Sequence, residues 1–183
     1  MKKINLWVKN HRTKLSAVLG IAFFVFSKPT PATLSLGAVP IVAGQLIRFW
    51  SAGHIHKNEI LTTTGPYSLS RNPLYVGSFV LGTGFIISMG VIWLAMVFLI
   101  FFALIYWFTI RWEEEKLART FPDGWDTYIK TVPRFLPLKS LPVYHPGQFS
   151  WAQAVRYKEV LNASFVLFVY GLLWAKAVLA GGA

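Results

Sequence analysis

Five apolar stretches follow one another along the chain, each long enough or nearly long enough to cross the roughly 30 Å hydrocarbon core of a bilayer. They run approximately from Leu15 to Phe26, Thr33 to Phe49, Tyr75 to Met89, Val91 to Ile110 and Ala163 to Leu179. The pattern predicts about five transmembrane helices, of which the first and third are short for a full crossing. We therefore expect an all-α integral membrane protein with one domain over residues 1–183.

Only Gly90 separates the third stretch from the fourth, which predicts a tight hairpin of two antiparallel helices. Two longer polar segments, approximately Ser51–Leu74 and Arg111–Asn162, interrupt the apolar pattern. Because charged side chains are costly within the hydrocarbon, any functional site is expected in these two segments.

Lysine and arginine are unevenly distributed about the predicted spans. With five crossings and the N-terminus inside, all 18 cations except Lys28 and Lys176 belong to cytoplasmic segments. Since positive residues favour that side, we expect the basic N-terminus, Met1–Lys14, and both polar segments in the cytoplasm, at the plasma membrane or, in a prokaryote, the inner membrane. Lys176 lies near the end of the last stretch, where its ammonium is expected to extend to the interface.

Composition narrows the possible functions. Hydrophobic residues make up 55% of the chain and charged residues only 14%, outside the range of soluble folds. The lysines and arginines that give the net charge of +11 lie beside the apolar stretches. This position indicates membrane lipid, and not nucleic acid, as the partner. The chain has no cysteine, which excludes thiolate nucleophiles and sulfur-ligated zinc. His54, His56 and Glu59 are spaced for hydrogen bonding better than for metal ligation, so we predict no metal site.

The first polar segment ends in Gly65-Pro66-Tyr67 and then Arg71-Asn72-Pro73-Leu74-Tyr75-Val76-Gly77, directly before the third apolar stretch. Asn before Pro predicts a helix start, with Asn72 as an N-cap that accepts backbone N–H groups and Pro73 as the first helical residue. A helix N-terminus beside the guanidinium of Arg71 is suited to bind a carboxylate or phosphate. The alternative is ordinary capping, with Arg71 facing lipid headgroups.

The fourth stretch continues into a charged helical segment, Arg111–Phe121, which carries Glu113 and Glu114. Carboxylates at the edge of the membrane are costly unless they are paired or hydrogen-bonded. We therefore expect both to line a polar cavity close to Arg71.

The residues Phe121-Pro122-Asp123-Gly124 predict a break in that helix, and prolines at 133 and 137 predict an extended stretch. Together they indicate a stiff loop folded back over the helix ends. Tyr128 and Arg134 would reach the site from this loop; alternatively, Tyr128 and Trp125 belong to the interfacial aromatic belt. The stretch Gln148–Tyr157 is typical of an amphipathic segment lying at the membrane surface.

In order and spacing these motifs resemble the isoprenylcysteine carboxyl methyltransferase family and its phospholipid-methyltransferase-like relatives. The resemblance covers about residues 61–137. It rests on Gly65-Pro66-Tyr67, Arg71-Asn72-Pro73-Leu74-Tyr75-Val76-Gly77, Glu113-Glu114 with Leu117 and Phe121, Tyr128, and Val132-Pro133 with Leu136-Pro137. Asn72 stands where the prenyl-protein enzymes have His, and Pro122 follows Phe121 where Gly is usual.

The resemblance implies an S-adenosylmethionine-dependent membrane methyltransferase whose cytoplasmic cofactor pocket faces a lipophilic acceptor, either a prenylcysteine-type carboxylate or a lipid amine. Arg71 and Arg134 would orient a carboxylate acceptor, whereas Glu114 would accept the proton of an amine. These three are the expected catalytic residues. The expected cofactor-binding residues are Gly65, Tyr67, Arg71, Asn72, Tyr75, Glu113, Glu114 and Tyr128.

Two other functions remain open on the sequence alone. One is an integral membrane reductase that uses NADPH on a sterol or lipid double bond. The other is a non-enzymatic membrane anchor with a basic face for anionic lipid, which would bind neither cofactor.

Overall fold

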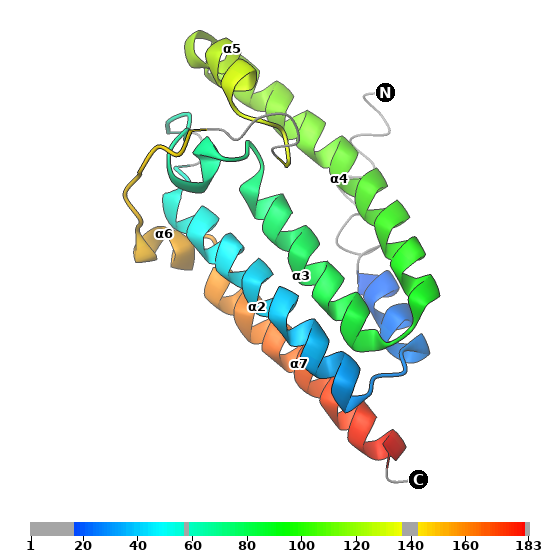
Figure 1. Cartoon of the computed structure of the whole chain (residues 1–183). Helices are drawn as coiled ribbons and strands as arrows, with labels where there is room; N and C mark the ends of the chain where they lie inside the picture. Colours follow the sequence, from blue (N-terminus) through cyan, green and yellow to red (C-terminus); the bar gives the residue numbers. More distant parts are fainter. Residues whose placement is uncertain (1–16, 57–58, 137–142, 182–183) are drawn as a thin grey trace.

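The computed structural model describes residues 17–56, 59–136 and 143–181, which form helices and the loops that flank them, with no strand among them (Figure 1). The prediction of an all-α fold is confirmed; the basic N-terminus Met1–Lys14 lies outside the described residues. The helices are Ala17–Phe26, α2 Pro31–His54, the 3-10 helix η1 Gly65–Ser68, α3 Pro73–Met89, α4 Ile92–Thr120, α5 Pro122–Thr131, α6 Trp151–Arg156 and α7 Glu159–Gly181.

All five predicted apolar stretches coincide with helices, but the helices differ in length. Three of them, α2, α4 and α7, are long and apolar enough to cross a membrane. Helix Ala17–Phe26 and the 17-residue α3 are shorter, and at 1.5 Å per residue α3 extends about 26 Å. The number of complete crossings therefore stays a prediction.

Helices α2 and α3 pack with their backbones unusually close, because glycines face each other across the contact. A Cβ atom added to Gly84 would lie 2.6 Å from the backbone nitrogen of Ile41, and one added to Gly44 would lie 2.7 Å from the carbonyl oxygen of Gly77. Neither position has room for a side chain. The close contact fixes α3, whose first turn carries the candidate site, against α2.

The turn between α3 and α4 is as tight as the sequence predicts. Gly90 adopts a left-handed conformation with φ of 68° and ends α3, and Val91 is already the N-cap of α4. Only glycine adopts this conformation without a steric penalty. The two helices then run antiparallel (Figure 1). The rings of Phe79 and Phe102 lie 5.0 Å apart between them.

The last helix, α7, runs alongside α2 (Figure 1), and it also contacts the first helix through Lys176. Tyr170 donates a hydrogen bond to the carbonyl oxygen of Leu34 at 2.7 Å. The ammonium of Lys176 donates to the carbonyl oxygens of Phe24 and Val25, at 2.6 and 3.0 Å. It does not simply extend to the interface, because the last carbonyls of a helix need donors and lipid supplies none.

The segment after α4 differs from the prediction of a stiff loop. Helix α4 continues to Thr120, and α5 begins two residues later with Pro122 in its first turn. Proline is favoured at that position because it lacks an N–H group and its φ is already helical. Trp125, Tyr128 and Val132 lie on one face of this amphipathic segment and are buried against α4 and the loop before η1. The break was predicted correctly, but a second helix follows it.

Candidate functional site

The start of α3 is where the two polar segments meet. Asn72 is the N-cap and Pro73 the first helical residue, as predicted. The prediction that the Asn72 side chain accepts backbone N–H groups is wrong. Its amide instead donates to the Glu114 carboxylate at 3.3 Å and to the carbonyl oxygen of Arg134 at 2.9 Å. The helix end needs little from this side chain, because Pro73 has no N–H and the N–H of Tyr75 already donates to the Asn72 carbonyl oxygen at 3.0 Å, whereas a buried carboxylate needs donors.

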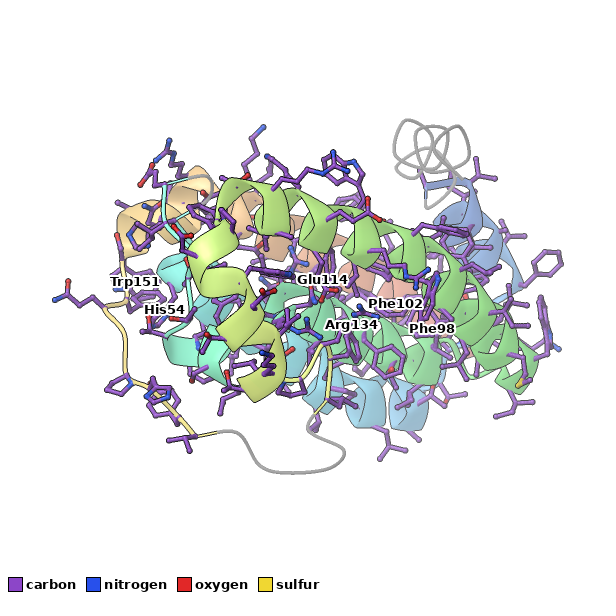
Figure 2. The ribbon with its side chains drawn as sticks, turned by 90° about the horizontal axis from the view of Figure 1, so that it is seen from above. His54, Phe98, Phe102, Glu114, Arg134 and Trp151 are labelled. Atoms are coloured by element: carbon purple, nitrogen blue, oxygen red, sulfur yellow. The ribbon has the colours of Figure 1, made fainter. Side chains whose placement is uncertain are left out.

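Glu114, buried at the polar end of α4, is the centre of the site. Arg134 binds one carboxylate oxygen through Nε at 2.9 Å and Nη2 at 2.8 Å, and the two side chains lie together in Figure 2. Arg71 approaches the other oxygen at 3.6 Å. The side chains of Glu114 and Arg71 are 8% and 12% exposed, that of Arg134 42%. Two guanidinium groups thus share one carboxylate, which leaves one net positive charge.

The three expected catalytic residues come from three different parts of the chain. Arg71 precedes α3, Glu114 is on α4, and Arg134 follows α5. The backbone also joins these parts, because the N–H of Arg71 donates to the carbonyl oxygen of Pro133 at 2.9 Å. The structure therefore brings together the residues that the sequence separates by up to 63 positions.

Glu113 is held on the neighbouring face of α4. The hydroxyl of Tyr75 donates to its carboxylate at 2.7 Å, and the Tyr75 ring lies 4.9 Å from that of Tyr106. The first turn of α3 thus contacts both acidic residues, Glu114 through Asn72 and Glu113 through Tyr75.

Tyr67 and Tyr128 complete the group. The hydroxyl of Tyr128 donates to the carbonyl oxygen of Tyr67 at 2.8 Å. Burial raises the pKa of both phenols well above the ordinary value. They are therefore neutral hydrogen-bond donors at every physiological pH.

Two buried donors of the site have no hydrogen-bond partner among the described residues: the hydroxyl of Tyr67 and Nε of Arg71. Burial lowers the pKa of Arg71, while the charge of Glu114 opposes that shift. The Arg71 guanidinium also lies 6.0 Å from the Trp125 ring centroid. Buried donors without partners are costly. Their presence beside an excess positive charge suits an anionic ligand group.

Gly65, the remaining expected cofactor residue, has a structural task. It adopts φ of 59°, and its N–H donates to the carbonyl oxygen of His145 at 2.7 Å. The segment that includes His145 and Gly147 crosses over η1, and Nε2 of His54 lies 3.3 Å from the Gly147 carbonyl oxygen. No periodicity or local motif in the sequence indicated this long-range contact. Gly65 thus shapes the backbone before Tyr67.

The histidines make backbone contacts. Nδ1 of His54 lies 2.9 Å from the carbonyl oxygen of Trp50, and Nδ1 of His56 lies 3.1 Å from that of His54. Over the described ranges, no three His, Asp or Glu side chains are grouped to hold a metal ion.

Comparison with known proteins identifies relatives over much of the chain. The phospholipid methyltransferase family matches residues 32–124, just over half of the sequence. The cobalt-zinc-cadmium resistance protein CzcN of Cupriavidus metallidurans is 33% identical over 158 residues, 81% of this chain and 68% of that protein. The nickel-cobalt-cadmium resistance protein NccN of Alcaligenes xylosoxydans xylosoxydans is 39% identical over 112 residues, 60% of this chain and 52% of that protein.

A eukaryotic enzyme is also related. The protein-S-isoprenylcysteine O-methyltransferase of Schizosaccharomyces pombe is 30% identical over 132 residues, 67% of this chain and 54% of that protein. The chain thus spans about half the length of NccN and of the yeast enzyme. No solved structure matches it significantly. The resemblance predicted from the motifs is confirmed: this integral membrane protein belongs to the phospholipid methyltransferase family.

Proposed function

We propose that the protein is an S-adenosylmethionine-dependent methyltransferase that acts at the cytoplasmic face of the membrane on a lipophilic acceptor. The proposal rests on the group around Glu114, where two arginines, one carboxylate and two unpaired buried donors meet at the start of α3. Membership of a methyltransferase family supports this function over an NADPH-dependent reductase or a membrane anchor.

The residues of the site fit the proposed cofactor. S-adenosylmethionine supplies a methyl group activated by a sulfonium, and it carries a carboxylate, an ammonium, ribose hydroxyls and a flat adenine. Arg71 and the Tyr67 hydroxyl would hold the carboxylate. Glu113 and Glu114 would accept hydrogen bonds from the ammonium or the ribose, and Asn72, Tyr75 and Tyr128 would fix the positions of these groups.

A cleft between α3 and α4 suits the hydrocarbon part of the acceptor. It encloses about 510 Å³ near the hairpin and is lined largely by apolar side chains, including Phe79, Ile86 and Phe98. Aromatic rings connect this cleft with the polar site. Phe79 lies 6.0 Å from Phe98 and 6.1 Å from Phe135, the residue after Arg134. Phe102, on α4, lies 6.4 Å from the same Phe135 ring. An acceptor whose tail lay between the helices would present its polar end to Arg134 and Glu114.

Positioning and exclusion of water are the main tasks of the protein in methyl transfer, because in-line displacement at the sulfonium carbon needs little covalent help. Arg134, the more exposed of the two arginines, would orient a carboxylate acceptor. Glu114 would take the proton of an amine acceptor. The name of the yeast relative states a prenylcysteine acceptor, but Asn72 departs from that group, so both acceptor classes stay in the proposal.

The metal-resistance proteins add no metal to the proposal. Their names refer to nickel, cobalt, cadmium and zinc, whereas the described residues offer no grouped ligands. We take from them the shared family and not a metal-binding role.

Purified protein in nanodiscs of native lipid, incubated with methyl-labelled S-adenosylmethionine, tests the proposal. We expect label in a lipid or lipidated product, and calorimetric binding of S-adenosylmethionine but not of NADPH. Arg71→Ala and Glu114→Ala should both weaken cofactor binding. Arg156→Ala, whose side chain is 66% exposed, is the matched control and should not. Absence of cofactor binding by the wild type, or unchanged affinity in both site variants, would reject the pocket.

A further inference from the structure

A second buried group of polar side chains joins α2, α3 and α7. The Arg48 guanidinium binds the Glu159 carboxylate at two points, Nε to Oε2 at 3.1 Å and Nη2 to Oε1 at 2.6 Å, and its Nη1 donates to the Ser78 hydroxyl. The side chains of Arg48 and Glu159 are 20% and 4% exposed. A two-point contact of this kind fixes orientation as well as distance.

Two amides complete this group. Gln45 donates to Glu159 at 3.4 Å, and Asn162 donates to the amide oxygen of Gln45 at 3.1 Å. The group therefore joins α2 to α7, and the two residues of its ion pair are 111 positions apart in the sequence. Apolar side chains would pack these helices as firmly, because removing two charges from water offsets much of their attraction. What an ion pair adds is a defined arrangement of the three helices.

The group is connected to the candidate site through α3. Ser78 lies one turn after Tyr75, the residue that binds Glu113. A Cβ atom at Gly77, the last residue of the first motif, would lie 2.7 Å from Cγ of Arg48. Gly77 therefore leaves room for the arginine to pass α3. The motif that ends in this glycine begins with Arg71, so one short helical segment contacts both groups.

We infer that Arg48 and Glu159 are positioning residues, which hold the first turns of α3 and through them Asn72 and Tyr75 against Glu114 and Glu113. Glu159 lies outside the part of the chain that matches the family, residues 32–124. The last helix thus supports the site from outside the segment that matches the family model. The effect on cofactor affinity rests on the proposed function, whereas the effect on α3 does not.

The test combines two measurements on Arg48→Ala, Glu159→Ala and the double variant in nanodiscs. Hydrogen exchange without cofactor should rise in the peptide covering residues 71–77 and stay at the wild-type level in α4. Affinity for S-adenosylmethionine should fall about tenfold in each single variant, and the double variant should lose no more than one single variant does. Arg156→Ala, whose ion pair with Glu59 is exposed on both sides, is the control and should change neither measurement.

Each outcome decides between positioning and simple stabilisation. Exchange that rises equally in every helix, or wild-type exchange at residues 71–77 in both single variants, would overturn the inference. If the alanine variants fail to fold, Arg48→Lys keeps the charge without the two-point contact and should show the same local pattern more weakly. If the wild type does not bind the cofactor, the proposed function fails while the exchange pattern still tests the role of the pair.

Discussion

Two carboxylates are buried among the described residues, those of Glu114 and Glu159. Their surroundings differ in a way that distinguishes a binding site from a contact that only holds helices together. Around Glu159 one arginine meets one carboxylate, and all five polar side chains have partners within the group. Around Glu114 two arginines meet one carboxylate, and donors of Arg71 and Tyr67 have no partner among the described residues. The group around Glu159 has balanced charges and satisfied hydrogen bonds, so it needs no ligand. The group around Glu114 has an extra positive charge and two donors without partners, which a ligand would satisfy.

The largest effect is expected from Glu114→Gln, which removes the charge that the two guanidinium groups share. Breaking a buried pair costs about 3–5 kcal/mol of folding free energy, and methyl transfer should fall on the order of 100-fold. Labelled methyl transfer and thermal unfolding in nanodiscs measure both. Glu115→Gln, at an exposed position one residue further along α4, is the matched control. Equal activity of the two variants would contradict the central role of Glu114.

The two arginines should differ according to their exposure. Arg71, with 12% of its side chain exposed, has a spare donor, whereas Arg134 is 42% exposed. Arg71→Ala should weaken S-adenosylmethionine binding about tenfold, and Arg134→Ala about threefold because solvent screens its charge. Calorimetry gives both values. The reverse order would show that the cofactor carboxylate lies on the other side of Glu114.

Tyr67→Phe sharpens the comparison because stability and binding should change in opposite directions. Removing a buried hydroxyl that has no partner should leave the free energy of unfolding unchanged or raise it by about 1 kcal/mol. The same change should lower cofactor affinity about threefold if the hydroxyl serves the ligand. Tyr128→Phe is the control of opposite sign, since it deletes a hydrogen bond to the Tyr67 carbonyl and should lower stability by about 1 kcal/mol. A loss of stability in Tyr67→Phe would argue for a structural role.

The smallest effect concerns alkaline pH. Because burial raises the pKa of Tyr67 and Tyr128 in the folded state, both phenols keep their protons above pH 10.0, where unfolded tyrosine loses them. Folding stability should therefore decrease as pH rises through about 10. Melting temperatures of the double variant Tyr67→Phe/Tyr128→Phe should decrease less steeply than those of the wild type. Parallel curves would mean that other groups dominate this range.

Local sequence signals predicted the site around Glu114 but not the group around Glu159. The apolar stretches gave the helices, Gly90 the hairpin, and the order of Arg71, Glu113 and Glu114 a shared site. Arg48 and Glu159 were not singled out, because a pair of side chains 111 residues apart has no periodicity and no neighbouring motif. The apolar pattern predicts α7 as a span, but it does not predict the ion pair made by the first residue of this helix, Glu159.

The remaining differences arose where one residue type serves two local structures. Pro122 and Gly124 are turn formers, but proline is also common in the first turn of a helix. Burial of Trp125 and Tyr128 on one face favours the helix α5 over a loop. Asn72 is an ordinary N-cap by sequence. Its amide donates to Glu114 because the tertiary fold brings this buried carboxylate within reach. The residues next to Asn72 in the sequence cannot indicate such a contact.

The contact between Lys176 and the carbonyl oxygens of Phe24 and Val25 has a consequence for biogenesis. Helix 17–26 obtains these donors only after synthesis has passed residue 176, 150 positions beyond the end of that helix. Ribosome-bound chains that end before residue 176 should therefore expose helix 17–26 to proteases, and released chains that include Lys176 should protect it.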